Sequence, residues 1–319
     1  MKYLLFLLAL LTLSIARAET IYVTLEKDNA LAVVDGIDGK LVKTVKVGLR
    51  PRGIALSHDR KQLYVAVSDS HSIQVLDVAT LKIVGKLPSG RDPETFAVDP
   101  SGERLYVSNE DDNLVTVVDV ASQKIIKQIP VGVEPEGIAV SPDGRWVVCA
   151  SETTNMAHWI DAKTLEVVDN TLVDARPRAL SFSADSKQLW VTSEMAGSVA
   201  VLDADTHQII KTISFQIPGV LKDKIQPVGV KIDDEGRWAY VALGPANRVA
   251  VIDAEKLEVS DYLLVGQRVW NIAFDPAQRY LYTANGASND ISTIGRHPRH
   301  TVSKSIAVGN YPWGLVVRP

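Results

Sequence analysis

The sequence predicts an all-β protein: a single seven-bladed β-propeller of four-stranded antiparallel blades, closed by pairing of the N- and C-terminal strands. Three observations predict this fold. Hydrophobic strands end in aspartate at intervals of 42 residues, seven strands of the Tyr-Val-Thr type keep the same register, and no helix-period run of useful length occurs. A period near 42 residues with four strands per unit is typical of propellers, whereas solenoid repeats have other periods and strand counts.

The aspartates that end a strand define the repeat. They are Asp35, Asp77, Asp119, Asp161, Asp203 and Asp253, spaced by 42 residues except for a last step of 50, and the next equivalent position holds Gly295. The Tyr-Val-Thr-like strands lie at 21–24, 63–66, 105–108, 147–150, 189–192, 239–242 and 281–284. Each unit adds a short apolar strand that follows a turn, as at 51–56, and a tight hairpin such as Ser-Pro-Asp-Gly at 141–144. The chain therefore holds seven copies of one four-stranded unit.

The two chain ends and the one irregular spacing complete the expected architecture. The last apolar strand, 312–317, has no sheet partners of its own, so pairing with strand 21–24 would close the ring and remove two exposed sheet edges. The step of 50 marks an insertion of eight residues around 214–225. It falls between an outer strand and the next inner strand, so we expect a surface excursion and a candidate partial lid.

Residues 1–18 are predicted to be a signal peptide, and 19–319 the propeller. Lys2 precedes an apolar run, and Ala16-Arg17-Ala18 supplies the small residues of a cleavage site, which predicts a periplasmic or secreted protein. No later segment is long and apolar enough to suggest a membrane anchor. Loss of Lys2 and Arg17 leaves 32 basic against 38 acidic side chains, a net charge of −6, which argues against nucleic-acid binding. The lone Cys149, in an apolar strand, is expected to be a core residue.

The repeats resemble the YVTN family of β-propeller repeat proteins. Four blade-specific segments, 133–137, 151–161, 244–249 and 265–270, resemble more narrowly a seven-repeat periplasmic subgroup associated with pyrroloquinoline-quinone-dependent (PQQ-dependent) alcohol catabolism. The resemblance covers the whole of 19–319. It implies a role beside a quinoprotein dehydrogenase or a transporter component, and it implies neither a bound PQQ nor catalytic residues in this chain.

Strand order predicts where a site would lie. If the tight hairpins lie on one rim, antiparallel order places the blade-to-blade loops on the opposite rim, around the central channel. The residue before each inner-strand turn, here called the outer mouth series, is Arg50, Asp92, Glu134, Arg176, Gln226, Arg268 or Tyr311. Two positions later the inner mouth series reads Arg52, Glu94, Glu136, Arg178, Val228, Trp270 and Trp313. Chemistry that changes at every blade within a constant framework indicates a ligand or partner site.

The binding candidates at this channel mouth are Arg50, Arg52, Arg91, Glu94, Glu134, Glu136, Arg176, Arg178, Arg268, Trp270, Tyr311 and Trp313. Two alternatives stay open: the charges could pair with one another to solvate the rim, and the two tryptophans could be core packing. A secondary candidate is His158, which replaces smaller side chains at its repeat position and could equally be a packed, hydrogen-bonded residue. The acidic loops at 26–29 and 110–113 and the residues Glu152 and Glu194 could hold Ca²⁺, but turn chemistry explains them better.

These observations favour a non-catalytic binding or accessory module over an enzyme. A lactonase-like hydrolase that uses Arg and Glu residues of the mouth is the alternative, although no nucleophile–base pair or metal triad is visible. A structural surface-layer component is the weakest of the three hypotheses. We expect no metal and no bound cofactor. The expected partners are a small molecule, a quinoprotein dehydrogenase or a transporter component.

Overall fold

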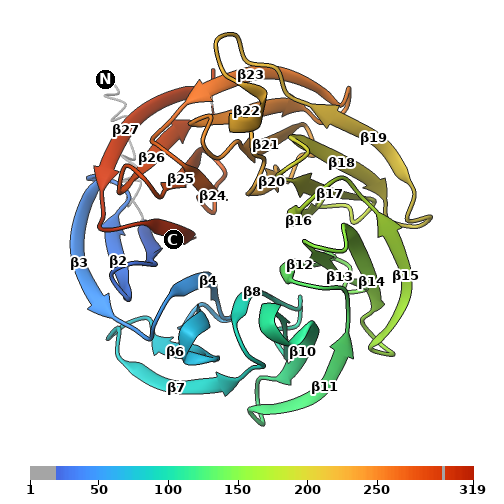
Figure 1. Ribbon diagram of the computed structural model, residues 1–319. Coiled ribbons are helices and arrows are strands. Elements are labelled where there is room, and N and C mark those ends of the chain that lie inside the picture. The colour runs from blue at the N-terminus through green and yellow to red at the C-terminus, as the bar shows by residue number, and fades with distance from the viewer. Residues whose placement is uncertain (1–18, 297–298) are drawn as a thin grey trace, which may run out of the picture.

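The computed structural model describes residues 19–296 and 299–319, which form seven four-stranded antiparallel sheets arranged in a ring around a central channel (Figure 1). The predicted signal peptide, residues 1–18, lies outside the described residues, as does His297. The seven-bladed propeller that the sequence predicts is confirmed. No helix of the described chain is long and apolar enough to cross a membrane.

The four strands of each blade run outward from the channel. The innermost strands are β4 (Pro51–Leu56), β8 (Pro93–Val98), β12 (Pro135–Val140), β16 (Pro177–Phe182), β20 (Val230–Ile232), β24 (Val269–Phe274) and β28 (Pro312–Arg318). The second strands are β5 (Gln62–Val67), β9 (Arg104–Asn109), β13 (Trp146–Ser151), β17 (Gln188–Ser193), β21 (Trp238–Ala242), β25 (Tyr280–Asn285) and β1 (Thr20–Leu25).

The third strands are β6 (Ser72–Asp77), β10 (Leu114–Asp119), β14 (Met156–Asp161), β18 (Ser198–Asp203), β22 (Arg248–Asp253), β26 (Asp290–Gly295) and β2 (Ala30–Asp35). The outer strands are β7 (Ile83–Pro88), β11 (Lys124–Pro130), β15 (Glu166–Leu172), β19 (Ile209–Ser214), β23 (Glu258–Leu264), β27 (Thr301–Ala307) and β3 (Lys40–Lys46). Three short 3₁₀ turns join them at η1 (Ser68–Ser70), η2 (Glu110–Asp112) and η3 (Lys222–Lys224).

The ring closes as the termini predict. β28 pairs antiparallel with β1, with Val317 opposite Ile21 and Leu315 opposite Val23, so that one blade has the order β28-β1-β2-β3. In Figure 1 the red C-terminal strand lies against the blue N-terminal blade. Because the last strand supplies the innermost position of the first blade, the inner edge of β1 is paired and not left open.

The aspartate repeat has a local physical cause. The Asp35 carboxylate accepts hydrogen bonds from the backbone N–H groups of Ile37 and Asp38, both at 2.9 Å, and Asp203 accepts one from Thr206 at 2.7 Å. These contacts satisfy backbone donors in the tight turn between the third and outer strands. The repeated aspartate is therefore a turn residue and has no part in the channel.

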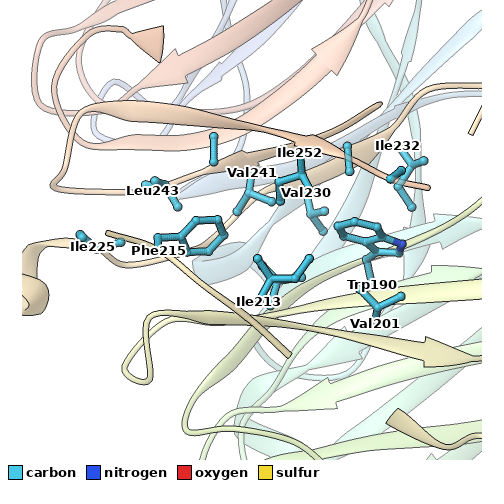
Figure 2. Packing of buried hydrophobic residues seen from close by; sticks show 14 of the residues in the cluster. Trp190, Val201, Ile213, Phe215, Ile225, Val230, Ile232, Val241, Leu243 and Ile252 are labelled. Carbon is cyan, nitrogen blue, oxygen red and sulfur yellow. The ribbon is translucent and has the colours of Figure 1, made fainter. Parts of the chain in front are cut away.

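Apolar clusters between neighbouring blades form the core, and the insertion contributes to one of them (Figure 2). Phe215, Ile217 and Ile225 are buried with Trp190 and Val230. The expectation of a surface excursion was therefore wrong for these three residues, which anchor the insertion between blades because their side chains are too apolar to stay in water. Cys149 is fully buried in another cluster, as expected of a core residue.

Candidate functional site at the channel mouth

The backbone of the outer mouth series adopts a conformation that few side chains favour. Arg50, Asp92, Glu134, Arg176, Arg268 and Tyr311 have φ between +47° and +60°, the left-handed region. Glycine adopts this region without strain, whereas other residues pay of order 1 kcal/mol for it. The sequence nevertheless places charged or aromatic residues at all six positions. Non-glycine residues also have positive φ in other turns of the chain, such as Leu81 and Leu165, so this conformation sets where the mouth side chains lie and does not by itself assign them a role.

Asparagines from the loops between the second and third strands hold this backbone in place. The Asn29 side-chain oxygen accepts a hydrogen bond from the N–H of Arg50 at 2.9 Å, and Asn155 does the same for Arg176 at 3.0 Å. The same contact recurs from Asn113, Asn247 and Asn289, and each of these five asparagines has a positive φ itself. The turn interpretation of these loops is therefore correct for the asparagines.

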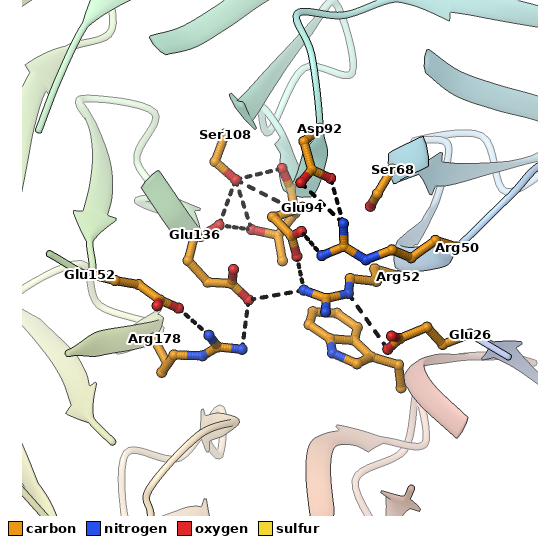
Figure 3. A network of polar contacts seen from close by, with 12 residues as sticks. Glu26, Arg50, Arg52, Ser68, Asp92, Glu94, Ser108, Glu136, Glu152 and Arg178 are labelled. Carbon is orange, nitrogen blue, oxygen red and sulfur yellow. Dashed lines mark hydrogen bonds and ion pairs between the residues drawn. The ribbon is translucent and has the colours of Figure 1, made fainter. Parts of the chain in front are cut away.

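The first part of the mouth is a chain of ion pairs centred on Glu94 (Figure 3). Glu94 is fully buried at the start of β8, and its carboxylate accepts a hydrogen bond from Nη2 of Arg50 at 2.7 Å. Arg52 binds its other carboxylate oxygen. Arg50 also contacts Asp92 at 3.0 Å, and Arg52 lies 4.0 Å from Glu136. Each arginine therefore connects two blades.

The second part of the chain is centred on Arg178, which is almost completely buried. Its guanidinium contacts Glu136 at 3.0 Å and Glu194 at 3.7 Å, and it also binds Glu152. Burial opposes the charge of Arg178, but the nearby carboxylates outweigh burial and raise the pKa of Arg178 above its ordinary value. One arginine thus compensates three acidic side chains from three different segments.

Two further arginines, Arg176, which is exposed, and Arg268, which is partly buried, extend this chain toward the next blades. Arg176 lies 2.8 Å from Glu152 and 3.4 Å from Glu194. Arg268 contacts Glu194 at 3.1 Å and donates to Gln226 Oε1 at 2.7 Å. We call the whole set the polar arc: Arg50, Arg52, Asp92, Glu94, Glu136, Glu152, Arg176, Arg178, Glu194 and Arg268.

The rest of the mouth is aromatic, and we call Trp270, Tyr311 and Trp313 the aromatic arc. Arg268 lies 4.2 Å from the ring centre of Trp270, and Arg52 lies 5.5 Å from that of Trp313, so the aromatic arc meets both ends of the polar arc. Both tryptophans are buried, and their indole N–H groups have no hydrogen-bond partner among the described residues. The tryptophans pack in the core, as the core-packing alternative expects, and they line the channel cavity as well, while a binding role for them stays a prediction.

A cavity of about 170 Å³ lies in the channel, lined mainly by glycine and aliphatic residues of the inner strands and by two members of each arc. Glu136, Arg178, Trp270 and Trp313 line it. Neighbouring inner strands approach closely below the mouth: a Cβ on Gly137 would lie 2.0 Å from the carbonyl oxygen of Arg178. The cavity therefore has a polar wall, an aromatic wall and room for about five or six water molecules at about 30 Å³ each.

Comparison with known proteins gives the family. Residues 13–142 match the YNCE-like β-propeller family, and residues 121–286, just over half of the chain, match the choice-of-anchor I domain family. The chain belongs to the choice-of-anchor I domain family. A search of curated proteins found no significant match. The narrower YVTN subgroup and its link to PQQ stay predictions.

Solved structures share the fold at low sequence identity. The periplasmic gluconolactonase PpgL of Pseudomonas aeruginosa is 16% identical, with a TM-score of 0.78 over 94% of this chain and 99% of that chain. A candidate 6-phosphogluconolactonase of Bacteroides fragilis is 16% identical, with a TM-score of 0.79 over 96% and 99%. A protein of Lactobacillus plantarum is 14% identical, with a TM-score of 0.81 over 95% and 99%. At these identities the similarity of these propellers to the family member described here shows the fold alone.

Burial alters the protonation of the mouth carboxylates. Burial is the largest cause that raises the pKa of Glu152 to about 7, opposed by Arg178 and reinforced by the negative charge of Glu136. Burial and Glu136 also raise the pKa of Glu94 and, less strongly, that of Glu110, while Arg52 opposes both shifts. A carboxyl group that titrates near neutral pH can hold or release a proton under ordinary conditions.

Stability is expected to fall as the pH rises from about 4.5 to about 7. In this interval the folded protein keeps a proton on Glu152 that the unfolded chain, with a pKa of 4.5, has lost. Glu152→Gln should flatten the dependence of the thermal midpoint on pH. The matched control is Glu166→Gln, at a carboxylate whose side chain is 65% exposed. An unchanged slope in Glu152→Gln would contradict this origin of the pH dependence.

Three of the sequence candidates lie outside the two arcs. Arg91 is 63% exposed and pairs with Asp112 at 2.9 Å. Glu134 has its side chain bonded by Thr153 and forms no ion pair within the described residues. His158 lies on β14, away from the mouth, with Nε2 accepting the N–H of Gly132 at 2.9 Å and Nδ1 facing Asn170.

In two other blades the side chain at the repeat position of His158 also accepts a hydrogen bond from the backbone N–H of a glycine. The Gln74 side chain accepts the N–H of Gly48, and Ser292 accepts that of Gly266. These contacts have the same spacing of 26 residues as the one between His158 and Gly132. Burial lowers the pKa of His158, which suits the neutral, hydrogen-bonded form. The packed-histidine alternative accounts for every contact of this side chain.

Sequence reasoning assigned the acidic loop residues Glu26, Glu152 and Glu194 to turns, whereas the structure places their carboxylates against mouth arginines. Arg52 Nε lies 3.6 Å from Glu26, and Arg178 contacts the other two. The signal was available: all three follow the second strand of a blade, and that end of the strand faces the mouth. Asp92, Glu94 and Glu110 also bring carboxylate oxygens within 4.8 Å of one another, but Arg50 already binds the first two.

Proposed function

We propose that this protein is an exported binding module whose channel mouth holds a small, oxygen-rich organic acid. The observation that carries the proposal is the pairing of a polar arc with an aromatic arc across one cavity. Arg178 and Glu136 line one side of the cavity, and Trp270 and Trp313 line the other. Concave sites with apolar walls and a few convergent polar groups are typical of small-molecule binding.

The chemistry of the two walls suits a compact molecule with hydroxyl and carboxyl groups. Guanidinium groups donate to ligand oxygens, carboxylates accept from hydroxyl groups, and indole faces pack against C–H surfaces. The indole N–H groups of Trp270 and Trp313 are buried, so the tryptophans would contact a ligand through their rings. The ion pairs of the polar arc hold its side chains in fixed positions. The binding site therefore needs little rearrangement before a ligand enters.

The wider role proposed here is that of an accessory component beside a PQQ-dependent alcohol oxidation or transport system in the periplasm. The resemblance of segments such as 151–161 and 244–249 supports it, as does the predicted signal peptide at 1–18. The partner would then be a quinoprotein dehydrogenase or a transporter component that receives or delivers the bound acid.

Native mass spectrometry of protein isolated from the exported fraction, without refolding, tests the binding role. We expect a small-molecule adduct on the wild type and its loss from Arg176→Gly/Arg268→Gly. Glycine suits the positive φ of both residues, so these changes remove mouth charges without new backbone strain. The matched control is Arg60→Gly, with φ of +58° in the hairpin between β4 and β5 at the opposite rim. If all three proteins retain the adduct equally, the small molecule binds outside the mouth.

A lactonase-like hydrolase is the second candidate, and the pKa of about 7 at Glu152 favours it, because such a carboxylate could activate water. The similar fold of the P. aeruginosa gluconolactonase adds support at the level of analogy. Hydrolysis of a lactone panel, with and without divalent metals, tests it. Turnover that Glu152→Gln lowers at least a hundredfold would favour the hydrolase, and no turnover in the wild type would exclude it for that panel.

A further inference from the structure

The inner strand β20 carries a lysine where the other six blades have small or apolar residues. Lys231 pairs in register with Tyr240 on β21. The residues at the same register on the other inner strands are Ala55, Ala97, Ala139, Ser181, Ala273 and Val316. A single long cationic side chain therefore replaces a short one at one point of the channel wall.

Lys231 lines the same cavity as Arg178 and Trp313. Its neighbours Val230 and Ile232 are buried in the cluster between blades, and Lys231, which alternates with them along the strand, is exposed on the opposite side. The lysine lies three residues beyond Val228, the member of the inner mouth series on this blade. It is thus placed deeper in the channel than the two arcs.

The amine of Lys231 differs from the mouth arginines in having no counter-charge. Within residues 19–296 and 299–319 it forms no hydrogen bond or ion pair, whereas every arginine of the polar arc contacts at least one carboxylate. Lys231 is open to the solvent of the channel, yet the protein atoms that surround it on the channel wall lower the pKa of its amine by desolvation, with no charged neighbour contributing. A cation that is partly removed from water and has no partner gains most from an anion that enters the cavity.

We propose that Lys231 binds the carboxylate of the small organic acid held by the channel. The assignment rests on the proposed function, because the remainder of the same molecule would lie between the polar and aromatic arcs. One unpaired ammonium matches one negative charge, which favours a monocarboxylate over a phosphate dianion, since the nearby guanidinium groups are already paired.

NMR of protein with ¹³C-methylated lysines tests this site with acetate as the probe, against sodium chloride of equal ionic strength. The Lys231 resonance is identified by its absence from Lys231→Met. We expect it to shift saturably with acetate, while the resonance of Lys187, 78% exposed, follows ionic strength only. A Lys231 resonance that behaves like that of Lys187 would overturn the proposal, as would inorganic phosphate binding tenfold tighter than acetate.

Calorimetry with D-gluconate separates this inference from the proposed function. Lys231→Met should weaken gluconate binding about tenfold, and Lys231→Arg should retain most of the affinity because the positive charge is kept. Arg176→Gly/Arg268→Gly should weaken gluconate binding and leave the acetate-induced shift of Lys231 unchanged. If acetate shifts Lys231 but the mouth changes leave gluconate affinity unaltered, binding at the mouth is refuted and the role of Lys231 is supported. If gluconate affinity depends on the mouth residues and not on Lys231, the role of Lys231 is refuted and binding at the mouth is supported.

Discussion

Deleting residues 312–319, and with them β28, is expected to abolish cooperative unfolding of the whole ring. β28 pairs with β1 over nearly its full length and buries Trp313, Leu315 and Val317. Burial of each such side chain contributes about 1.5–3 kcal/mol, and the exposed edge of β1 would promote aggregation. The summed loss is comparable with the whole stability of a typical protein, about 5–15 kcal/mol. Chemical denaturation followed by circular dichroism measures the effect.

A graded variant keeps this prediction informative if the truncated chain is insoluble. Leu315→Ala should destabilise the protein by about 2–5 kcal/mol, because it leaves a cavity in the apolar cluster that Leu315 shares with Val23 and Tyr282. Removal of Pro319 alone should change nothing, since that residue follows the strand. A soluble truncated protein with a wild-type transition would mean that closure through the termini is dispensable.

Arg178→Met is expected to destabilise the protein by about 3–5 kcal/mol at pH 7.5. The substitution removes the one cation that contacts all three of Glu136, Glu152 and Glu194, whose side chains are 3–6% exposed. The remaining contacts of these carboxylates are with arginines that are more exposed than Arg178. Methionine fills much of the same volume, so the loss reports the uncompensated carboxylates more than a cavity. The loss should shrink as the pH falls toward 5, because protonation neutralises the carboxylates whose partner is missing.

The matched control for this change is Arg91→Met on the same rim. Its partner Asp112 and the arginine itself are in contact with water, and an exposed ion pair contributes about 0–1 kcal/mol. Urea denaturation of both variants at pH 7.5 and pH 5 gives the comparison. A loss below about 1 kcal/mol for Arg178→Met would mean that water already solvates the three carboxylates.

The fold could be predicted from the sequence because each blade repeats the same local chemistry. The strand-ending aspartates bind turn N–H groups, and the Tyr-Val-Thr-like strands are apolar throughout because both faces are buried. Seven such units with one unpaired terminal strand leave few arrangements besides a closed ring. The insertion could not be predicted as well, since its length suggested a surface loop while Phe215 and Ile217 pack between blades.

The candidate site could be predicted in part. The mouth series was visible because charged residues replace one another at fixed repeat positions. The partners of Arg178 were not predicted, since Glu152 and Glu194 come from a different loop series, which was interpreted as turns although its residues follow strands that end at the mouth. Lys231 was not among the predicted site residues, because it lies within the inner strand β20, beyond the turn positions that define the two mouth series.

Titration calorimetry with a panel of small oxygen-rich acids and their lactones tests the central claim, that the unequal residues of the channel mouth form a binding site. We expect both the wild type and Arg60→Gly to bind at least one of these compounds saturably. Binding by Arg176→Gly/Arg268→Gly should be at least tenfold weaker. Equal affinity in the three proteins, or no binding of any panel member to a folded wild type, would contradict the claim.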